Sequence, residues 1–322
     1  MTHENPVIAV VGLGTMGCGI AVAALTAGIA VRLVDADSSA TDLGYKRIVR
    51  RLQGHVETGL LPSNSLEMLR EADVAADLLD ACDAVDMVIE AVPEAWAAKR
   101  KVLESLSAMT DGVIATNTSA FPVDRLASSV SRPSRFLGLH FFNPAEWIPG
   151  VELVPGEQTS LECVETAIAM LHRMSKEPTV VKSSPGFLAN RLQLALFAEC
   201  MRCVDEGLAS PQDVDRVVSS TFGFRLPAFG PFAIADMAGL DVYESIFNTL
   251  TEAYGERFRP PDSFRRLIEQ ERFGVKVRRG YAPYSEAEVE ELVPVRDAVY
   301  SRLLLATRSG QAPADPSRQG PR

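Results

Sequence analysis

Cysteine and histidine are scarce in this chain of 322 residues, which contains five of the first and four of the second. The cysteines are odd in number and widely spread, at Cys18, Cys82, Cys163, Cys200 and Cys203. This pattern excludes a disulfide framework and favours reduced thiols in a cytoplasmic protein. Cys200 and Cys203 have the spacing of a metal-binding pair, but no second pair accompanies them, so we expect core packing and no metal site.

Basic residues and long apolar runs are also lacking. Asp and Glu number 42 against 32 Lys and Arg, a net charge of −10, which argues against a general nucleic-acid or anionic-membrane surface. No apolar run approaches the 18 or more residues of a membrane span, and the acidic start of the chain is not a signal peptide. With 47% hydrophobic residues the chain can still bury a large core, which excludes disorder over most of its length.

The first part of the chain alternates apolar strands with helical segments. This rhythm predicts an α/β fold, a doubly wound sheet with helices on both faces. The block 38–70 is polar and helical in period. The predicted strands are residues 7–11, 31–34, 85–92, 113–116, 136–141, 151–154 and 179–182.

The rhythm changes after Lys182-Ser-Ser-Pro-Gly186, where Pro and Gly punctuate the chain. From there on the pattern is helical, over residues 187–207, 211–221, 240–254 and 285–306. We therefore predict a dinucleotide-binding domain over 1–183, an all-α substrate and dimerisation domain over 184–308, and a disordered tail over 309–322.

Three glycines mark a nucleotide-binding turn. Gly12-Leu-Gly14-Thr15-Met16-Gly17 follows a strand and precedes a helix, where Gly12 permits the turn, Gly14 lets the backbone approach a pyrophosphate, and Gly17 lets helix and sheet pack closely. The second strand ends in Asp35, 18 residues beyond Gly17, where a carboxylate can accept hydrogen bonds from ribose hydroxyls and repel a 2′-phosphate. The pattern indicates NAD as the cofactor.

His140 is the histidine placed for chemistry, because it closes a strand, and ligands of open α/β sheets bind beyond the carboxyl ends of strands. On position alone, a structural histidine is an equally good explanation. Three polar groups complete a catalytic constellation. They are Ser119, at the end of another strand, Glu152, in the next strand, and Asn190, beyond the hinge that we predict at Ser183-Ser-Pro-Gly186. Closure of the two domains would then complete the site.

The chain resembles the L-3-hydroxyacyl-CoA dehydrogenase family, and the likeness spans nearly all of it. The matching segments are Gly12-Leu-Gly-Thr-Met-Gly-Cys-Gly-Ile-Ala21, Ile89-Glu-Ala-Val-Pro-Glu94, Thr116-Asn-Thr-Ser119, Arg135-Phe-Leu-Gly-Leu-His-Phe-Phe-Asn-Pro144 and Pro185-Gly-Phe-Leu-Ala-Asn-Arg191. The resemblance implies a Rossmann-type domain followed by a helical domain that forms a homodimer.

The same resemblance implies roles for individual residues. His140 becomes the general base that takes the proton of a 3-hydroxyl group, Glu152 its partner, and Ser119 and Asn190 polar groups at the substrate. The residues implied to contact NAD are Asp35, Glu94, Lys99, Ser119, Asn143 and Lys276.

The substrate handle stays open, because the chain departs from the family pattern in three places. Arg51 and Thr58 stand where the family has a serine and a lysine that contact CoA. Pro149 stands where thioester-specific relatives carry a basic residue, and the segment resembles that of carnitine or gulonate dehydrogenases, which act on free hydroxy acids. Arg278 stands where the family has glycine. The alternatives for the small-molecule substrate are a 3-hydroxyacyl group on CoA, a 3-hydroxyacyl group on a carrier protein, and a free 3-hydroxy acid. A different class of function, a non-catalytic NAD-binding protein, is a further alternative.

Overall fold

The computed structural model describes residues 6–308, and the chain divides into two compact units, Met1–Leu196 and Phe197–Arg322. The predicted boundary after residue 183 lies before the helix α7 (Ala189–Asp205), which runs on through the division between the two units. The tail predicted to be disordered, residues 309–322, lies outside the described residues.

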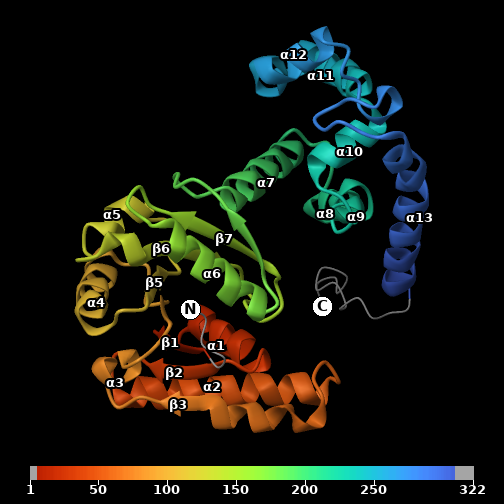
Figure 1. Cartoon of the computed structure of the whole chain (residues 1–322). Helices are drawn as coiled ribbons and strands as arrows, with labels where there is room; N and C mark the ends of the chain where they lie inside the picture. Colours follow the sequence, from red (N-terminus) through yellow and green to blue (C-terminus); the bar gives the residue numbers. More distant parts are fainter. Residues whose placement is uncertain (1–5, 309–322) are drawn as a thin grey trace. The chain divides into compact units, whose positions relative to one another are not determined.

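One sheet organises the first unit (Figure 1). Its strand order is β3-β2-β1-β4-β5-β6-β7-β8, and every neighbouring pair is parallel except β6 and β7, which are antiparallel. The order reverses between β1 and β4, and a crevice at such a point is where open α/β sheets bind ligands. The strands are β1 (Val7–Val11), β2 (Ala30–Val34), β3 (Ala72–Val74), β4 (Met87–Glu90), β5 (Val113–Thr116), β6 (Phe136–Phe141), β7 (Gly150–Pro155) and β8 (Glu177–Val180).

Two hydrophobic cores lie on the two faces of this sheet. Alternate residues of β1 point to opposite faces, so Ile8 and Val10 enter one core and Ala9 and Val11 the other. The first core is closed by α1 (Thr15–Thr26), α2 (Ser38–Glu57) and α6 (Leu161–Arg173). The second is closed by α3 (Leu78–Cys82), α4 (Trp96–Met109) and α5 (Val123–Ala127). This arrangement confirms the predicted doubly wound sheet.

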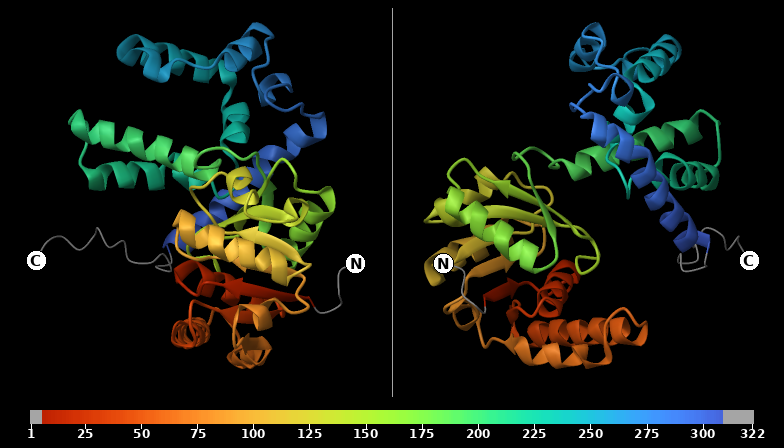
Figure 2. Two further views of the ribbon diagram at one scale, coloured as in Figure 1. Left: turned by 90° about the vertical axis from the view of Figure 1, so that its left-hand side faces the viewer. Right: turned by 45° about the vertical axis from the view of Figure 1, so that its right-hand side comes forward.

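The second unit is helical. Among its described residues there is no strand, only two isolated β-bridges near Arg279 (Figure 2). Its helices, after the end of α7, are α8 (Pro211–Ser220), α9 (Phe222–Arg225), α10 (Pro231–Ala238), α11 (Leu240–Tyr254), α12 (Asp262–Glu269) and α13 (Glu286–Arg308). Short 3₁₀ helices are η1 (Ser63–Glu71) and η2 (Pro133–Arg135) in the first unit, and η3 (Gly255–Phe258) and η4 (Val275–Val277) in the second.

The polar block 38–70 differs from the prediction. It is not one helical stretch, because α2 ends at Glu57, the chain turns through Gly59, whose φ is +73°, and η1 follows Pro62. The edge strand β3, which comes next, was not predicted because only three residues form it and two of them are exposed. None of the helices within residues 6–308 is long and apolar enough to cross a membrane.

Candidate active site

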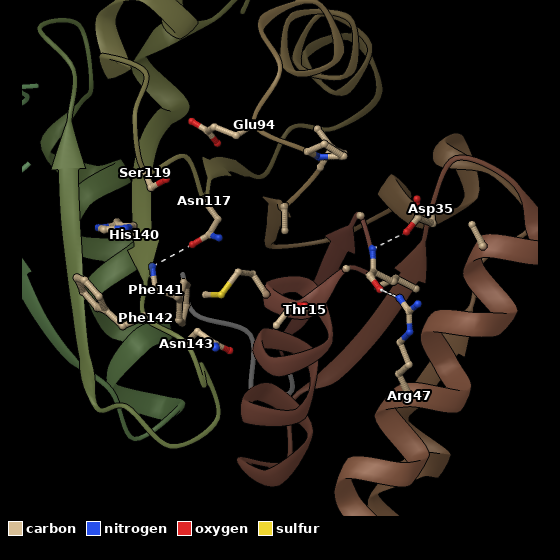
Figure 3. Close-up of a pocket in the computed structure, with 18 of the residues that line it drawn as sticks. Thr15, Asp35, Arg47, Glu94, Asn117, Ser119, His140, Phe141, Phe142 and Asn143 are labelled. Atoms are coloured by element: carbon tan, nitrogen blue, oxygen red, sulfur yellow. Dashed lines mark hydrogen bonds between the residues drawn. The ribbon is translucent and has the colours of Figure 1, made fainter. Parts of the chain in front are cut away.

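A cavity of about 550 Å³ opens at the carboxyl ends of the parallel strands in the first unit (Figure 3). Asp35 and Arg47 lie on one side of it, and Glu94, Ser119 and His140 lie on the other, with Thr15 between them. Most of the residues predicted for the cofactor and catalytic sites between β1 and the loop after β6 line this cavity, and the two exceptions are Gly17 and Lys99. Those that do are Gly12, Gly14, Thr15, Met16, Asp35, Glu94, Ser119, His140 and Asn143.

The Gly12–Gly17 turn has the geometry that a dinucleotide requires. Gly12 has a φ of +93°, and a Cβ there would lie 2.8 Å from the backbone of Ala91. A Cβ on Gly17 would lie 1.8 Å from the carbonyl oxygen of Gly12, so only glycine lets α1 approach β1 this closely; Gly17 packs the turn and does not line the cavity. At the N-cap of α1, Gly14 has open space within 4 Å of the position of a Cβ. The first-turn N–H groups of α1 therefore face room for a phosphate.

Asp35 lies just beyond the end of β2 and is tied to the glycine turn. Its Oδ2 accepts a hydrogen bond from the Leu13 N–H at 2.6 Å, and its Oδ1 accepts from the Ala36 N–H at 2.7 Å. Because a carboxylate has about four lone-pair sites, acceptor capacity remains for two ribose hydroxyls. The turn and the acid together fit NAD.

His140 and Glu152 form a buried pair at the other end of the cavity. They are register partners on the antiparallel strands β6 and β7, so their side chains emerge on the same face. The Nδ1 of His140 lies 2.7 Å from Glu152 Oε2, and each residue is 5% exposed. No partner for the His140 Nε2 occurs in the described range 6–308. This nitrogen is the one available to a ligand in the cavity.

The second oxygen of Glu152 holds the start of α7. Its Oε1 accepts hydrogen bonds from the N–H groups of Leu188 at 2.9 Å and Ala189 at 2.7 Å. At the next residue, the side-chain amide of Asn190 donates to the carbonyl oxygen of Ser119 at 3.4 Å. Both residues belong to the first unit, so the expected closure of two domains is not needed to bring them together.

The loop 142–149, which follows β6 and carries Asn143, is held from two sides. The ammonium group of Lys176 donates to the carbonyl oxygens of Ala145 at 2.6 Å and Ile148 at 2.9 Å. Burial lowers the pKa of Lys176, and the nearby Glu146 carboxylate opposes that shift. Glu146 is also paired with Arg51 of α2 at 2.8 Å.

The structure separates the residues that the resemblance grouped at NAD. Glu94 lines the cavity, but Lys99 is fully buried behind it and donates to Glu90 Oε1 at 2.8 Å. Lys276 lies in the second unit, where its Nζ is 2.5 Å from Asp241 Oδ2.

Sequence reasoning did not select several residues at the cavity, among them Asn117, Arg47 and Phe142. Asn117 lines it, and its Oδ1 accepts a hydrogen bond from the Phe141 N–H at 2.9 Å. Arg47 of α2 also lines it and donates to the Leu13 carbonyl oxygen at 3.3 Å. The Phe142 ring lies 4.5 Å from the His140 ring between centroids. Asn117 follows a strand end, so the rule that selected Ser119 also applied to it.

Comparison with known proteins identifies related sequences over most of the chain. The family model "3-hydroxyacyl-CoA dehydrogenase, NAD binding domain" matches residues 7–184, and "3-hydroxyacyl-CoA dehydrogenase, C-terminal domain" matches residues 186–284. A probable 3-hydroxybutyryl-CoA dehydrogenase of Bacillus subtilis is 34% identical over 282 residues, which cover 87% of this chain and 97% of that protein.

Two further relatives are named for different substrates. A 5-formyl-3-hydroxy-2-methylpyridine 4-carboxylate 5-dehydrogenase of Mesorhizobium japonicum is 32% identical over 94% of this chain and 96% of its own length. The crystal structure of a 3-hydroxyacyl-CoA dehydrogenase from Archaeoglobus fulgidus is 31% identical, covers 94% of this chain and 100% of its own, and superposes with a TM-score of 0.78.

Proposed function

Because the chain belongs to the 3-hydroxyacyl-CoA dehydrogenase family, we propose that His140 is the general base that deprotonates the hydroxyl of an L-3-hydroxyacyl substrate. The family and its relatives make the chain an NAD-dependent oxidoreductase of this type. The observation that carries the assignment of His140 is its 2.7 Å contact with the buried Glu152 carboxylate, which leaves Nε2 toward the cavity.

The residues divide the reaction between them. Glu152 accepts a hydrogen bond from the Nδ1–H of His140, so the free lone pair of the imidazole lies on Nε2. The carboxylate also stabilises the imidazolium that forms when His140 takes the proton. Ser119 and Asn190 donate hydrogen bonds to the oxygen that becomes the ketone. When bound, NAD accepts the hydride from the carbon of the alcohol.

For the cofactor we propose two sets of contacts. The N-terminus of α1, from Gly14 to Met16, binds the pyrophosphate, and Asp35 binds the adenosine ribose. Glu94, Ser119 and Asn143 bind the part nearest His140, since they line the same end of the cavity. Lys99 acts through Glu94, and the contact of Lys276 with NAD remains a prediction.

A free carboxylic acid is the second candidate substrate, in place of a CoA or carrier-protein thioester. Pro149 and Arg278 depart from the thioester-specific pattern, and the Mesorhizobium relative is named for a pyridine carboxylate. A thioester substrate would place the chain in fatty acid metabolism, and a free acid would not.

We also propose that the protein is a cytoplasmic homodimer formed through its helical unit. Five free cysteines support a reducing compartment. Within the described part of the second unit, the buried apolar core contains Ala235, Leu240 and Phe264, while large apolar side chains such as Ile246 and Leu305 are more than half exposed. A surface of this kind favours an obligate partner.

A substrate panel tests the proposed function. With NAD present, NADH formation is followed at 340 nm for 3-hydroxybutyryl-CoA, carnitine and gulonate, and kcat/KM is compared. We expect the CoA thioester to give the highest value; a free acid ahead of it favours the second candidate. Tight NAD binding without turnover of any hydroxy compound would support a non-catalytic NAD-binding protein.

A further inference from the structure

A fully buried ion pair lies behind the cavity wall and takes no part in the proposed proton transfer. Glu90, the last residue of β4, and Lys99 of α4 are both 0% exposed, and the Lys99 Nζ lies 2.8 Å from Glu90 Oε1 and 3.2 Å from Oε2. The Glu90 carboxylate also accepts from the Thr116 hydroxyl at 2.6 Å and from the Val92 N–H at 2.8 Å. Such buried pairs add little stability compared with apolar residues of the same size.

The pair connects to the cavity through Glu94. The Lys99 Nζ lies 3.4 Å from Glu94 Oε2, and the Glu94 side chain, 34% exposed, lines the cavity. The Thr118 hydroxyl and the Ala120 N–H donate to the other Glu94 oxygen. Glu90, Lys99 and Glu94, which we call the charge triad, therefore carry two negative charges and one positive charge in contact, a net charge of −1.

The position of the charge triad relative to the reaction is fixed by the cavity. Glu94 lies on the same side as Ser119 and His140, across from Asp35 (Figure 3). If His140 is the base, the ring that accepts the hydride must lie at this end. That ring is a cation in NAD⁺ and neutral in NADH, so a nearby net negative charge stabilises the oxidised form more than the reduced form.

We propose that the net charge of the triad sets the relative affinity for NAD⁺ and NADH, and that Glu90 contributes to this preference without touching the cofactor. Glu90 is therefore a positioning residue that acts through Lys99 and Glu94. The proposal rests on the proposed function, because His140 defines which end of the cavity holds the nicotinamide.

The test is Glu90→Gln, measured by the dissociation constants of NAD⁺ and NADH for the full-length protein. The amide can still accept from Lys99 or Val92 and donate to Thr116, but the triad becomes neutral. We expect the ratio Kd(NADH)/Kd(NAD⁺) to fall by about threefold to tenfold. A ratio unchanged in the folded variant overturns the proposal.

Two controls separate charge from structure. Glu104→Gln removes the same charge from an exposed pair with Arg100 on α4, and should leave the ratio as in the wild type. Glu90→Gln combined with Lys99→Met restores the net charge to −1 and should restore the wild-type ratio. If this double variant keeps the altered ratio, the effect comes from displaced side chains and the proposal is wrong.

Should Glu90→Gln alone fail to fold, the double variant still tests one consequence of the proposal. Its ratio must then equal the wild-type ratio although both buried groups are gone, and a shift of more than about threefold rejects the proposal. Failure of the proposed function is separate, since it would appear as a wild-type protein that binds both cofactor forms but oxidises no hydroxy compound.

Discussion

At the scale of single residues, the site depends on contacts between side chains far apart in the sequence. His140 and Glu152 are brought together because β6 and β7 are antiparallel, whereas the other neighbouring strands are parallel. Pattern alone placed His140 at a strand end but could not fix this register, and the pairing came from the family resemblance. The burial of Lys99 was not predictable either, because a lysine on a polar helix is normally solvated.

Asp35 gives the first prediction at this scale. Asp35→Ala removes the acceptor proposed for the ribose and the anchor of the Leu13 N–H. We expect the Kd for NAD to rise about tenfold or more, and the preference for NAD over NADP to narrow. Titration calorimetry measures both. Asp42→Ala, which removes an exposed carboxylate from α2, is the matched control. Unchanged NAD affinity in Asp35→Ala would remove Asp35 from the site.

The cysteines give a prediction from shifted pKa values. Burial raises the pKa of Cys82 to about 11 and that of Cys163 to about 12, and it also raises the pKa of Cys18. Since the thiolate is the reactive form, a pKa of about 11 leaves ~0.1% of a thiol reactive at pH 8. Cys200 and Cys203 are partly exposed. We therefore expect two of the five thiols to react quickly with Ellman's reagent, and the other three only after unfolding. Rapid reaction of a third thiol in the native protein is the contrary result.

At the scale of elements, the long strands and helices were predictable, and the short irregular ones were not. The apolar runs of β1 and β6 and the helices α8 and α11 lie where periodicity placed them. The strand β3 and the helices α9, α10 and α12 have three to eight residues, too few to show a period. Tertiary contacts, not local sequence, define these elements.

The turn after η4 gives a prediction at this scale. Arg278 has φ +57° and ψ +20°, a left-handed conformation that costs an L-residue about 1 kcal/mol relative to glycine. Its contact with Glu286, at 3.7 Å between exposed side chains, contributes little. Arg278→Gly should therefore raise the free energy of unfolding of the helical unit by about 0.5–1 kcal/mol.

Urea denaturation checks this, with Arg278→Ala as the control that loses the ion pair but keeps the strained backbone. We expect the alanine variant to lie within about 0.5 kcal/mol of the wild type. A glycine variant less stable than the alanine variant would mean that the left-handed turn is not a source of strain.

At the scale of the whole molecule, the described helical unit has a small buried core, whereas many of its large apolar side chains are exposed. The 47% hydrophobic content predicted a folded chain, but it could not reveal which large apolar side chains of the described helical unit stay exposed. We expect sedimentation at micromolar concentration to give twice the mass of the 34.9 kDa chain. A monomer under those conditions would contradict the proposed homodimer.

The central claim is that the imidazole of His140, oriented by Glu152, takes the proton from the substrate alcohol. The most direct measurement compares His140→Asn with the wild type, using kcat for the best substrate of the panel and the Kd for NADH. Because the asparagine cannot accept the proton as a base, we predict a fall in kcat of about 10² or more with nearly unchanged NADH affinity. Equal turnover in the two proteins would refute the role of His140.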